Sequence, residues 1–187
     1  MLTDGDRPAT RRPAAPGNPR NPAFAGLRPS LRRIQPVKIV IVGCGRVGST
    51  LARTMAEAGH EVSVVDESVS SFARLGEDFS GQMVVGSGVD EEILRRAGIE
   101  NADCFASVTN GDNRNIMAAQ IAKEVFDVAR VITRIYDPIR AEVYRELGLE
   151  TICPTTIGAA LLEEFFTTGH NAASTGTVLP RPAGATS

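Results

Sequence analysis

Short apolar runs alternate with stretches of helical periodicity between residues 37 and 169. The runs are rich in β-branched residues and are bounded by glycine or polar residues, which is typical of buried strands. The intervening stretches repeat apolar residues every three or four positions, which predicts helices. Strands are expected at 38–42, 61–66, 83–85, 104–108, 131–135 and 151–153, and helices at 46–58, 68–77, 90–97, 112–126, 138–147 and 156–166.

The alternation of strands and helices with short connections favours one architecture. A strand that is followed by a helix returns parallel to its neighbour through a right-handed crossover. The sequence therefore predicts the α/β class, with a single Rossmann-like, doubly wound domain. Its six-stranded parallel sheet is expected in the strand order 3-2-1-4-5-6, with helices on both faces.

The two ends of the chain differ in composition from this middle part. Residues 1–36 hold seven of the eleven prolines and seven arginines, and residues 170–187 are mostly small and polar. Neither stretch can bury enough apolar surface to offset the entropy of ordering it. We therefore expect flexible tails at 1–36 and 170–187 around one nucleotide-binding domain at 37–169, which leaves no room for a separate substrate-binding domain.

The charge distribution bears on possible partners. The chain has a net charge of −2, and because the first 36 residues carry seven arginines against two aspartates, residues 37–187 carry −7. An acidic body argues against nucleic acid as the main ligand. The longest apolar run has six residues, far short of the ~20 needed to cross a bilayer, so no direct membrane insertion is expected. The three cysteines form no C-x-x-C pair and no metal-binding spacing, which suits a reduced, cytoplasmic protein.

A glycine-rich loop follows the first expected strand. Residues 43–48, Gly-Cys-Gly-Arg-Val-Gly, fit G-x-G-x-x-G between a strand and a helix, and Asp66 ends the next strand eighteen residues later. Gly43 permits the tight turn, Gly45 lets a pyrophosphate approach the backbone, and Gly48 lets the helix pack closely on the strand. The helix N-terminus then offers free N–H groups to phosphates. The alternative is a glycine turn that binds nothing.

Two side chains carry the expected ligand chemistry. The Asp66 carboxylate is suited to both hydroxyls of a ribose and repels a 2′-phosphate, which favours NAD(H) or an unphosphorylated adenosine ribose over NADP(H). The alternative is that Asp66 merely caps the helix that opens near Ser68, and the two roles are compatible. The Arg46 guanidinium is suited to chelating a diphosphate or the outer phosphate of ATP or ADP. The alternative for Arg46 is a solvated position on the outer face of the helix.

No catalytic constellation accompanies this loop in the sequence. His60 precedes the second strand, at the sheet edge opposite the ligand, and His170 lies in the tail. A Tyr-x-x-x-Lys pair, a nucleophile elbow and a metal-binding cluster are all missing. The sequence therefore predicts a protein that binds a nucleotide and is not an enzyme.

Further motifs extend across residues 38–166. They are Val65-Asp66, Val85-Gly86, the run from Asp90 to Ile99, Asn101-Ala-Asp103, the Thr-x-x-Asp-x-x-Asn stretch from Thr109 to Asn115, Arg134, Asp137-Pro138 and Leu147-Gly148. Together with the glycine loop, they make this part of the chain resemble the TrkA-N domain, also called the RCK or KTN domain, of Trk/Ktr-type potassium-uptake regulatory proteins.

The resemblance implies a function. It implies a regulatory subunit that binds NAD(H), with ADP or ATP as the alternative, and that controls a membrane potassium channel or transporter. The subunit would be cytoplasmic and peripheral to the inner face of the membrane through that partner.

The resemblance also assigns ligand contacts by position. The glycine loop would hold the phosphates, the end of the second strand the ribose, and two further turns the adenine and the distal half of the ligand. For Arg134 the alternative is an intradomain salt bridge. The implied residues are Gly43, Cys44, Gly45, Arg46, Val47 and Gly48 in the loop, Asp66 at the ribose, Glu67, Gly86 and Ser87 at the adenine, and Thr109, Asn110 and Arg134 at the distal half.

The chain departs from the family pattern in two places. Residues 86–89 read Gly-Ser-Gly-Val where the family commonly has Gly-Asp-Ala-Thr, which removes an acidic acceptor for the adenine amino group. No second, C-terminal ligand-binding domain follows residue 169, so the expectation is a truncated or a one-domain regulator.

The last expected helix favours self-association. Residues 156–166 present a broad apolar face, made of Ile157, Leu161, Leu162, Phe165 and Phe166, with little chain left to cover it. A second copy would bury that face, so a homodimer or a higher ring is expected through this helix. The alternative is that the helix packs back on its own sheet.

Two other functions share the same nucleotide site. The first is an NAD-dependent oxidoreductase whose substrate site is completed by another chain, and it predicts hydride transfer. The second is an adenine-nucleotide sensor for some other partner, which the sequence does not separate from a potassium-transport regulator.

Overall fold

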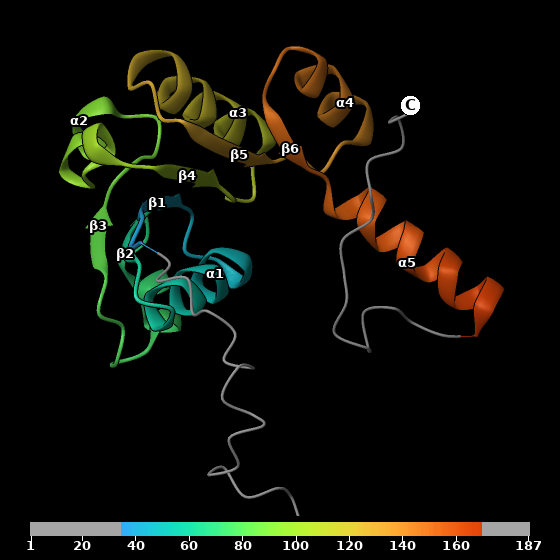
Figure 1. Cartoon of the computed structure of the whole chain (residues 1–187), viewed down its shortest axis with the longest axis horizontal. Coiled ribbons are helices and arrows are strands. Elements are labelled where there is room, and N and C mark those ends of the chain that lie inside the picture. The colour runs from blue at the N-terminus through green and yellow to red at the C-terminus, as the bar shows by residue number, and fades with distance from the viewer. Residues whose placement is uncertain (1–34, 170–187) are drawn as a thin grey trace, which may run out of the picture. The chain divides into compact units, whose positions relative to one another are not determined.

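Six parallel strands form a sheet in the order β3-β2-β1-β4-β5-β6. The computed structural model describes residues 35–169, so the predicted tails at 1–36 and 170–187 lie almost wholly outside the described residues. The sheet order and the parallel pairing confirm the predicted fold class (Figure 1). The strands are β1 (Lys38–Val42), β2 (Glu61–Asp66), β3 (Gln82–Val85), β4 (Cys104–Ser107), β5 (Arg130–Arg134) and β6 (Glu150–Ile152).

Helices connect the strands, and two of them differ from the expected type. They are α1 (Arg46–Glu57), the 3-10 helix η2 (Val69–Leu75), α2 (Glu91–Arg96), the 3-10 turn η3 (Ile99–Asn101), α3 (Asp112–Gln120), the π-helical turn η4 (Ile121–Val125), α4 (Pro138–Glu146) and α5 (Pro154–Thr168).

The segment expected as a helix at 68–77 is the 3-10 helix η2. Its buried side chains, Phe72 and Leu75, lie three residues apart, which matches the repeat of a 3-10 helix. The helix expected at 112–126 ends as an α-helix at Gln120 and continues as a wider turn, in which the N–H of Phe126 donates to the carbonyl of Ile121. This turn leads to Asp127, whose φ of 52° ends the helix.

The helices lie on both faces of the sheet, which confirms the predicted layering. Figure 1 shows α2, α3 and α4 on one face and α1 on the other. Each face has its own buried cluster. Val40, Phe105 and Ile116 belong to the first cluster, and Ile41 and Val64 belong to the second.

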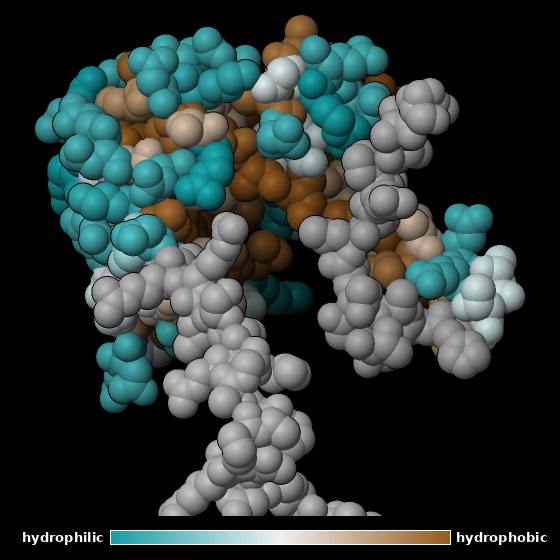
Figure 2. Space-filling model, in the orientation of Figure 1, coloured by the Kyte–Doolittle hydropathy of each residue, from teal (hydrophilic) through white to brown (hydrophobic). Residues whose placement is uncertain are grey.

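The face that carries α1 is uncovered over the later strands. An apolar groove lies there, lined by residues that include Ile39, Leu51, Met55 and Ile132. Ile132 on β5 is 42% exposed. Figure 2 shows hydrophobic residues gathered in a hollow of the surface between α1 and α5.

Helix α5 contributes nothing to either buried cluster. None of its residues is buried, and Phe166 is 79% exposed. The structure therefore does not show the alternative in which this helix packs back on its own sheet. Within residues 35–169, no helix combines the length and the apolar character that crossing a bilayer requires.

We expect Gly48→Ala to lower the free energy of unfolding by about 1–3 kcal/mol, measured by urea denaturation. A Cβ at Gly48 would overlap the carbonyl oxygen of Gly43 and press on Val108. The matched control is Gly158→Ala in α5, where a Cβ would meet no atom within 4 Å. Equal denaturation midpoints for the two variants would contradict this packing argument.

Candidate ligand-binding cleft

The glycine loop joins β1 to α1 at the carboxyl edge of the sheet. Gly43 has a φ of +104°, a conformation that favours glycine, and its N–H donates to the carbonyl of Val65 at 2.8 Å. Gly45 is the N-cap of α1, and a Cβ there would meet nothing within 4 Å. No side chain of the described residues caps this helix, and its first turn holds no acid. Its first N–H groups therefore remain available to an anion.

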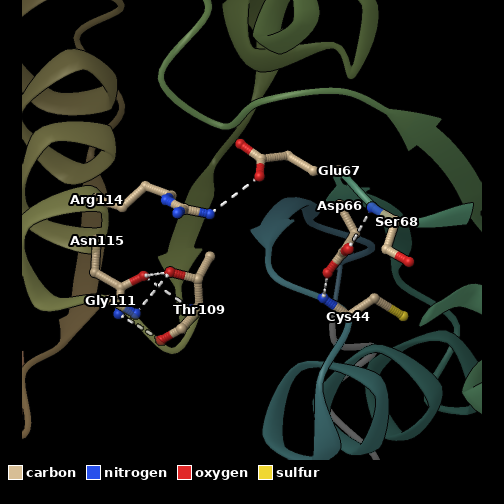
Figure 3. Close-up of polar contacts among 8 residues, drawn as sticks. All are labelled: Cys44, Asp66, Glu67, Ser68, Thr109, Gly111, Arg114 and Asn115. Atoms are coloured by element: carbon tan, nitrogen blue, oxygen red, sulfur yellow. Dashed lines mark hydrogen bonds and ion pairs between the residues drawn. The ribbon is translucent and has the colours of Figure 1, made fainter.

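Asp66 ties the glycine loop to the end of β2. One carboxylate oxygen accepts the N–H of Cys44 at 2.7 Å, and the other accepts the N–H of Ser68 at 2.8 Å (Figure 3). The second contact shapes the turn before η2, and no side-chain hydrogen bond within the described residues caps that helix, so the capping role that the sequence left open is not seen. Each carboxylate oxygen has a further lone pair, so these two bonds leave Asp66 able to accept from a ligand as well.

Asn115 performs the corresponding task on the other side of the cleft. Its side chain is fully buried, and its amide oxygen accepts from the N–H and the hydroxyl of Thr109 at 2.8 and 2.6 Å. Its amide nitrogen donates to the carbonyls of Thr109 and Arg134, each at 2.9 Å. One side chain thus joins α3 to the ends of β4 and β5.

Asp112 extends this connection to the start of α4. Its carboxylate accepts the N–H groups of Tyr136 at 2.9 Å and Asp137 at 3.2 Å. Asp137 in turn caps α4 by accepting the N–H groups of Ile139 and Arg140. The Thr-x-x-Asp-x-x-Asn stretch therefore holds two strand ends and the next helix start in place.

Arg134 is a buried cation without a carboxylate partner among the described residues. Its residue is 8% exposed, and its guanidinium donates to the carbonyl of Thr109 and lies over the Tyr136 ring, 4.5 Å from the centroid. Its Nε–H has no hydrogen-bond acceptor among residues 35–169. The intradomain salt bridge that the sequence left open is not present within residues 35–169.

These elements enclose a cleft of about 580 Å³, within the usual range for small-molecule sites. Ten of the thirteen residues implied by the resemblance line it, and Cys44, Gly48 and Ser87 do not. The sequence did not lead us to expect ligand contacts from the other lining residues. These are Val42, Val65, Ser71, Arg74, Gly88, Val108, Arg114 and Tyr136.

Cys44 and Gly48 serve the loop itself. The Cys44 thiol is buried and donates to the carbonyl of Ser71 at 3.3 Å. Burial, with a smaller contribution from the Asp66 charge, raises the pKa of this thiol to about 11, so it stays neutral at physiological pH. Gly48 provides the space in which α1 approaches the Gly43 carbonyl.

The cleft carries an excess of positive charge. Four arginines line it, Arg46, Arg74, Arg114 and Arg134, against the two acids Asp66 and Glu67. The structure records no side-chain hydrogen bond or ion pair for Arg46 or Arg74 within the described residues. Arg114 pairs with Glu67 at 3.1 Å. Such a surface is suited to an anionic ligand. In this part of the chain, no group of three His, Cys, Asp or Glu side chains is placed to hold a metal ion.

Comparison with known families identifies the fold. The model of the TrkA-N domain matches residues 39–154. The chain belongs to the TrkA-N domain family. The match confirms the resemblance drawn from the motifs.

This TrkA-N chain is similar to curated potassium uptake proteins. It is 55% identical over 114 residues to the Trk system potassium uptake protein TrkA of Streptomyces coelicolor, covering 61% of this chain and 51% of that protein. The TrkA homolog of Methanothermobacter thermautotrophicus is 30% identical over 130 residues, covering 69% and 60% of the two chains. The chain thus spans about half the length of the curated relatives it matches.

Solved structures share the TrkA-N fold. The Shewanella denitrificans Kef CTD in its AMP-bound form superposes with a TM-score of 0.61 at 21% identity, over 74% of this chain and 85% of that one. The GsuK structure bound to ADP gives 0.61 at 21% identity, over 72% and 35%, and the GsuK channel bound to NAD gives 0.53 at 21% identity, over 66% and 22%. At this identity, the likeness shows the fold alone.

We expect Asn115→Ala to lower the free energy of unfolding by about 2–4 kcal/mol, because it removes the acceptor of the Thr109 N–H and one donor from each of the Thr109 and Arg134 carbonyls. Urea denaturation measures the change. Asn113→Ala is the matched control in the same helix, because Asn113 is exposed and its side chain accepts a hydrogen bond from Arg140. The control is expected to stay within about 0.5 kcal/mol of the parent. A loss below 1 kcal/mol for Asn115→Ala would contradict its role as the junction.

Proposed function

We propose that the chain is a nucleotide-binding regulatory domain of a potassium-uptake system. It binds an adenine nucleotide in the cleft, with NAD(H) as the first candidate and ADP or ATP as the second. It acts from the cytoplasm on a membrane potassium channel or transporter. The proposal rests on one observation above all, the set of unpaired donors that faces the cleft.

Arg134 is the strongest of these donors. A buried guanidinium normally has a carboxylate or several acceptors around it, because an unpaired buried charge is costly. Arg134 has one carbonyl acceptor and an aromatic ring, and it retains an unused Nε–H. An anionic group of a ligand would supply the missing acceptors.

The glycine loop also supports phosphate binding in the cleft. The first turn of α1 has no capping side chain, and space is open beside Gly45. Arg46 follows in that turn, exposed and unpaired among the described residues. Main-chain N–H groups, a helix dipole and a guanidinium then converge on one place, a combination suited to a pyrophosphate.

The solved relatives support the choice of an adenine nucleotide. Their names state that the Kef domain holds AMP and that GsuK holds ADP or NAD. In this chain, Asp66 offers the carboxylate that an unphosphorylated ribose requires. For regulation, the ligand must bind two conformations with different affinity, because equal affinity shifts no population.

Arg46→Gln is expected to weaken ADP binding about tenfold and to leave adenosine binding within twofold, because one charge-assisted contact to phosphate is lost. Isothermal titration calorimetry measures both ligands. Arg53→Gln, an exposed arginine on the same helix outside the cleft, is the matched control. Equal losses for ADP and adenosine would refute the phosphate role of Arg46.

The parent chain is also to be titrated with NAD, NADH, ATP and NADP. A nucleotide that binds, present at one hundred times its dissociation constant, should raise the free energy of unfolding by about 2.7 kcal/mol. Thermal denaturation then shows a higher melting temperature. Parent protein that binds no adenine nucleotide, or that changes the nicotinamide absorbance with a substrate, would overturn the regulatory assignment.

We further propose that a second copy of the chain covers α5. The helix has no buried residue, and an apolar groove is open on the α1 face of the same chain. In a two-fold dimer, α5 of each copy would pack into the apolar groove of the other copy, so both apolar surfaces would be buried. A homodimer, or a ring built from dimers, would then form through this helix.

Leu162→Asp combined with Phe166→Asp is expected to weaken self-association at least tenfold in sedimentation experiments. These side chains lie one helical turn apart and are 59% and 79% exposed, and burying each in a dimer is worth about 1.5–3 kcal/mol. Val69→Asp, 68% exposed on η2, is the control. A parent chain that stays monomeric at high concentration would contradict the proposal.

A further inference from the structure

An ion pair between Glu67 and Arg114 crosses the cleft. Glu67 directly follows β2, and Arg114 lies in the first turn of α3, so the pair joins segments forty-seven residues apart. Figure 3 shows it spanning the space between the Asp66 network and the Asn115 network. Both residues line the cleft, and their side chains are 52% and 46% exposed.

The pair engages only one of the hydrogen-bond donors of Arg114. The contact is a single hydrogen bond of 3.1 Å from one terminal nitrogen of Arg114 to one oxygen of Glu67. A guanidinium has five N–H donors, and no other partner for this one is recorded within the described residues. Exposed ion pairs contribute only about 0–1 kcal/mol, so a stronger acceptor can displace Glu67 at little cost.

A phosphate is such an acceptor. It carries more charge than a carboxylate and accepts from an arginine in bidentate geometry. Arg114 borders the same cleft as Gly45 and Arg46, where the ligand phosphates are proposed to lie.

We infer, on the basis of the nucleotide binding proposed above, that Glu67 and the phosphates of the ligand compete for Arg114. Without ligand, Glu67 holds the guanidinium across the cleft. When a ligand with a diphosphate enters, Arg114 transfers to the phosphates and Glu67 is released. Arg114 thereby selects ligands by their phosphate charge, and Glu67 lowers the affinity that Arg114 would otherwise provide.

The release of Glu67 has a second consequence. The chain has Ser87 where the family pattern places an acidic acceptor for the adenine amino group. Glu67 lies at the end of the cleft assigned to adenine and becomes a free acceptor once Arg114 has left it. Phosphate recognition and adenine recognition are then coupled through one exchange of partners.

Competition predicts opposite effects for the two partners. The measured quantity is the ratio of the adenosine to the ADP dissociation constant, obtained by calorimetry, because a general loss at the adenine cancels in it. Arg114→Gln should lower this ratio about tenfold. Glu67→Gln keeps an acceptor oxygen and removes the charge that holds Arg114, so it should raise the ratio about two- to fivefold. The double variant should match Arg114→Gln.

The matched controls are Arg145→Gln and Glu142→Gln, an exposed ion pair on α4 outside the cleft. They should leave the ratio unchanged, and the denaturation midpoints of all variants should stay close to that of the parent. If the pair instead closes over the bound ligand as a clasp, both cleft variants would lower the ratio or leave it equal, and competition would be overturned. Parent protein that binds neither ADP nor adenosine would overturn the proposed function together with this inference.

Discussion

The buried amide of Asn115 is the interaction on which the shape of the cleft depends. Adjacent parallel strands hold each other through their ladders, but their carboxyl ends leave the ladder and need another constraint. Asn115 supplies it with all its hydrogen-bonding groups, since it accepts from Thr109 and donates to the carbonyls of Thr109 and Arg134. A network that is fully satisfied and dry is stiff, because any displacement leaves a polar group unpaired.

Asp66 applies the same solution to the first half of the sheet. Its two carboxylate oxygens accept main-chain N–H groups of the glycine loop and of the turn after β2. The side of the cleft at β2 is therefore held by the Asp66 carboxylate, and the side at β4 and β5 by the Asn115 amide. Hydrogen bonds thus constrain the main chain on both sides of the cleft. The exposed arginines at the rim, Arg46 and Arg74, are not held by any partner in the described residues. The cleft therefore combines a main chain held by hydrogen bonds with arginine side chains that are free to reorient.

The sequence predicted the fold and the position of the cleft well, because both follow from local patterns. Strand periodicity, the glycine turn and Asp66 at a strand end need no knowledge of distant contacts. The sequence did not predict that Arg114 and Tyr136 line the cleft, because their positions depend on contacts between distant segments. The packing of α3 places Arg114, and the Asp112 carboxylate holds the main chain at Tyr136. The motif that contains Asn115 was visible, but its side chain is a junction within the fold, and sequence patterns do not distinguish that role from ligand contact.

The charge of the rim also explains why an acidic chain can bind an acidic ligand. A net charge of −2 repels a nucleotide only weakly at physiological ionic strength, because the field of distant charges is screened within about 8 Å. Inside the cleft, four arginines against two acids dominate at short range. One of those acids, Glu67, is paired with Arg114. The positive potential that a ligand meets therefore depends on whether this ion pair is formed. The local arrangement of ion pairs, more than the total charge, therefore determines what the cleft attracts.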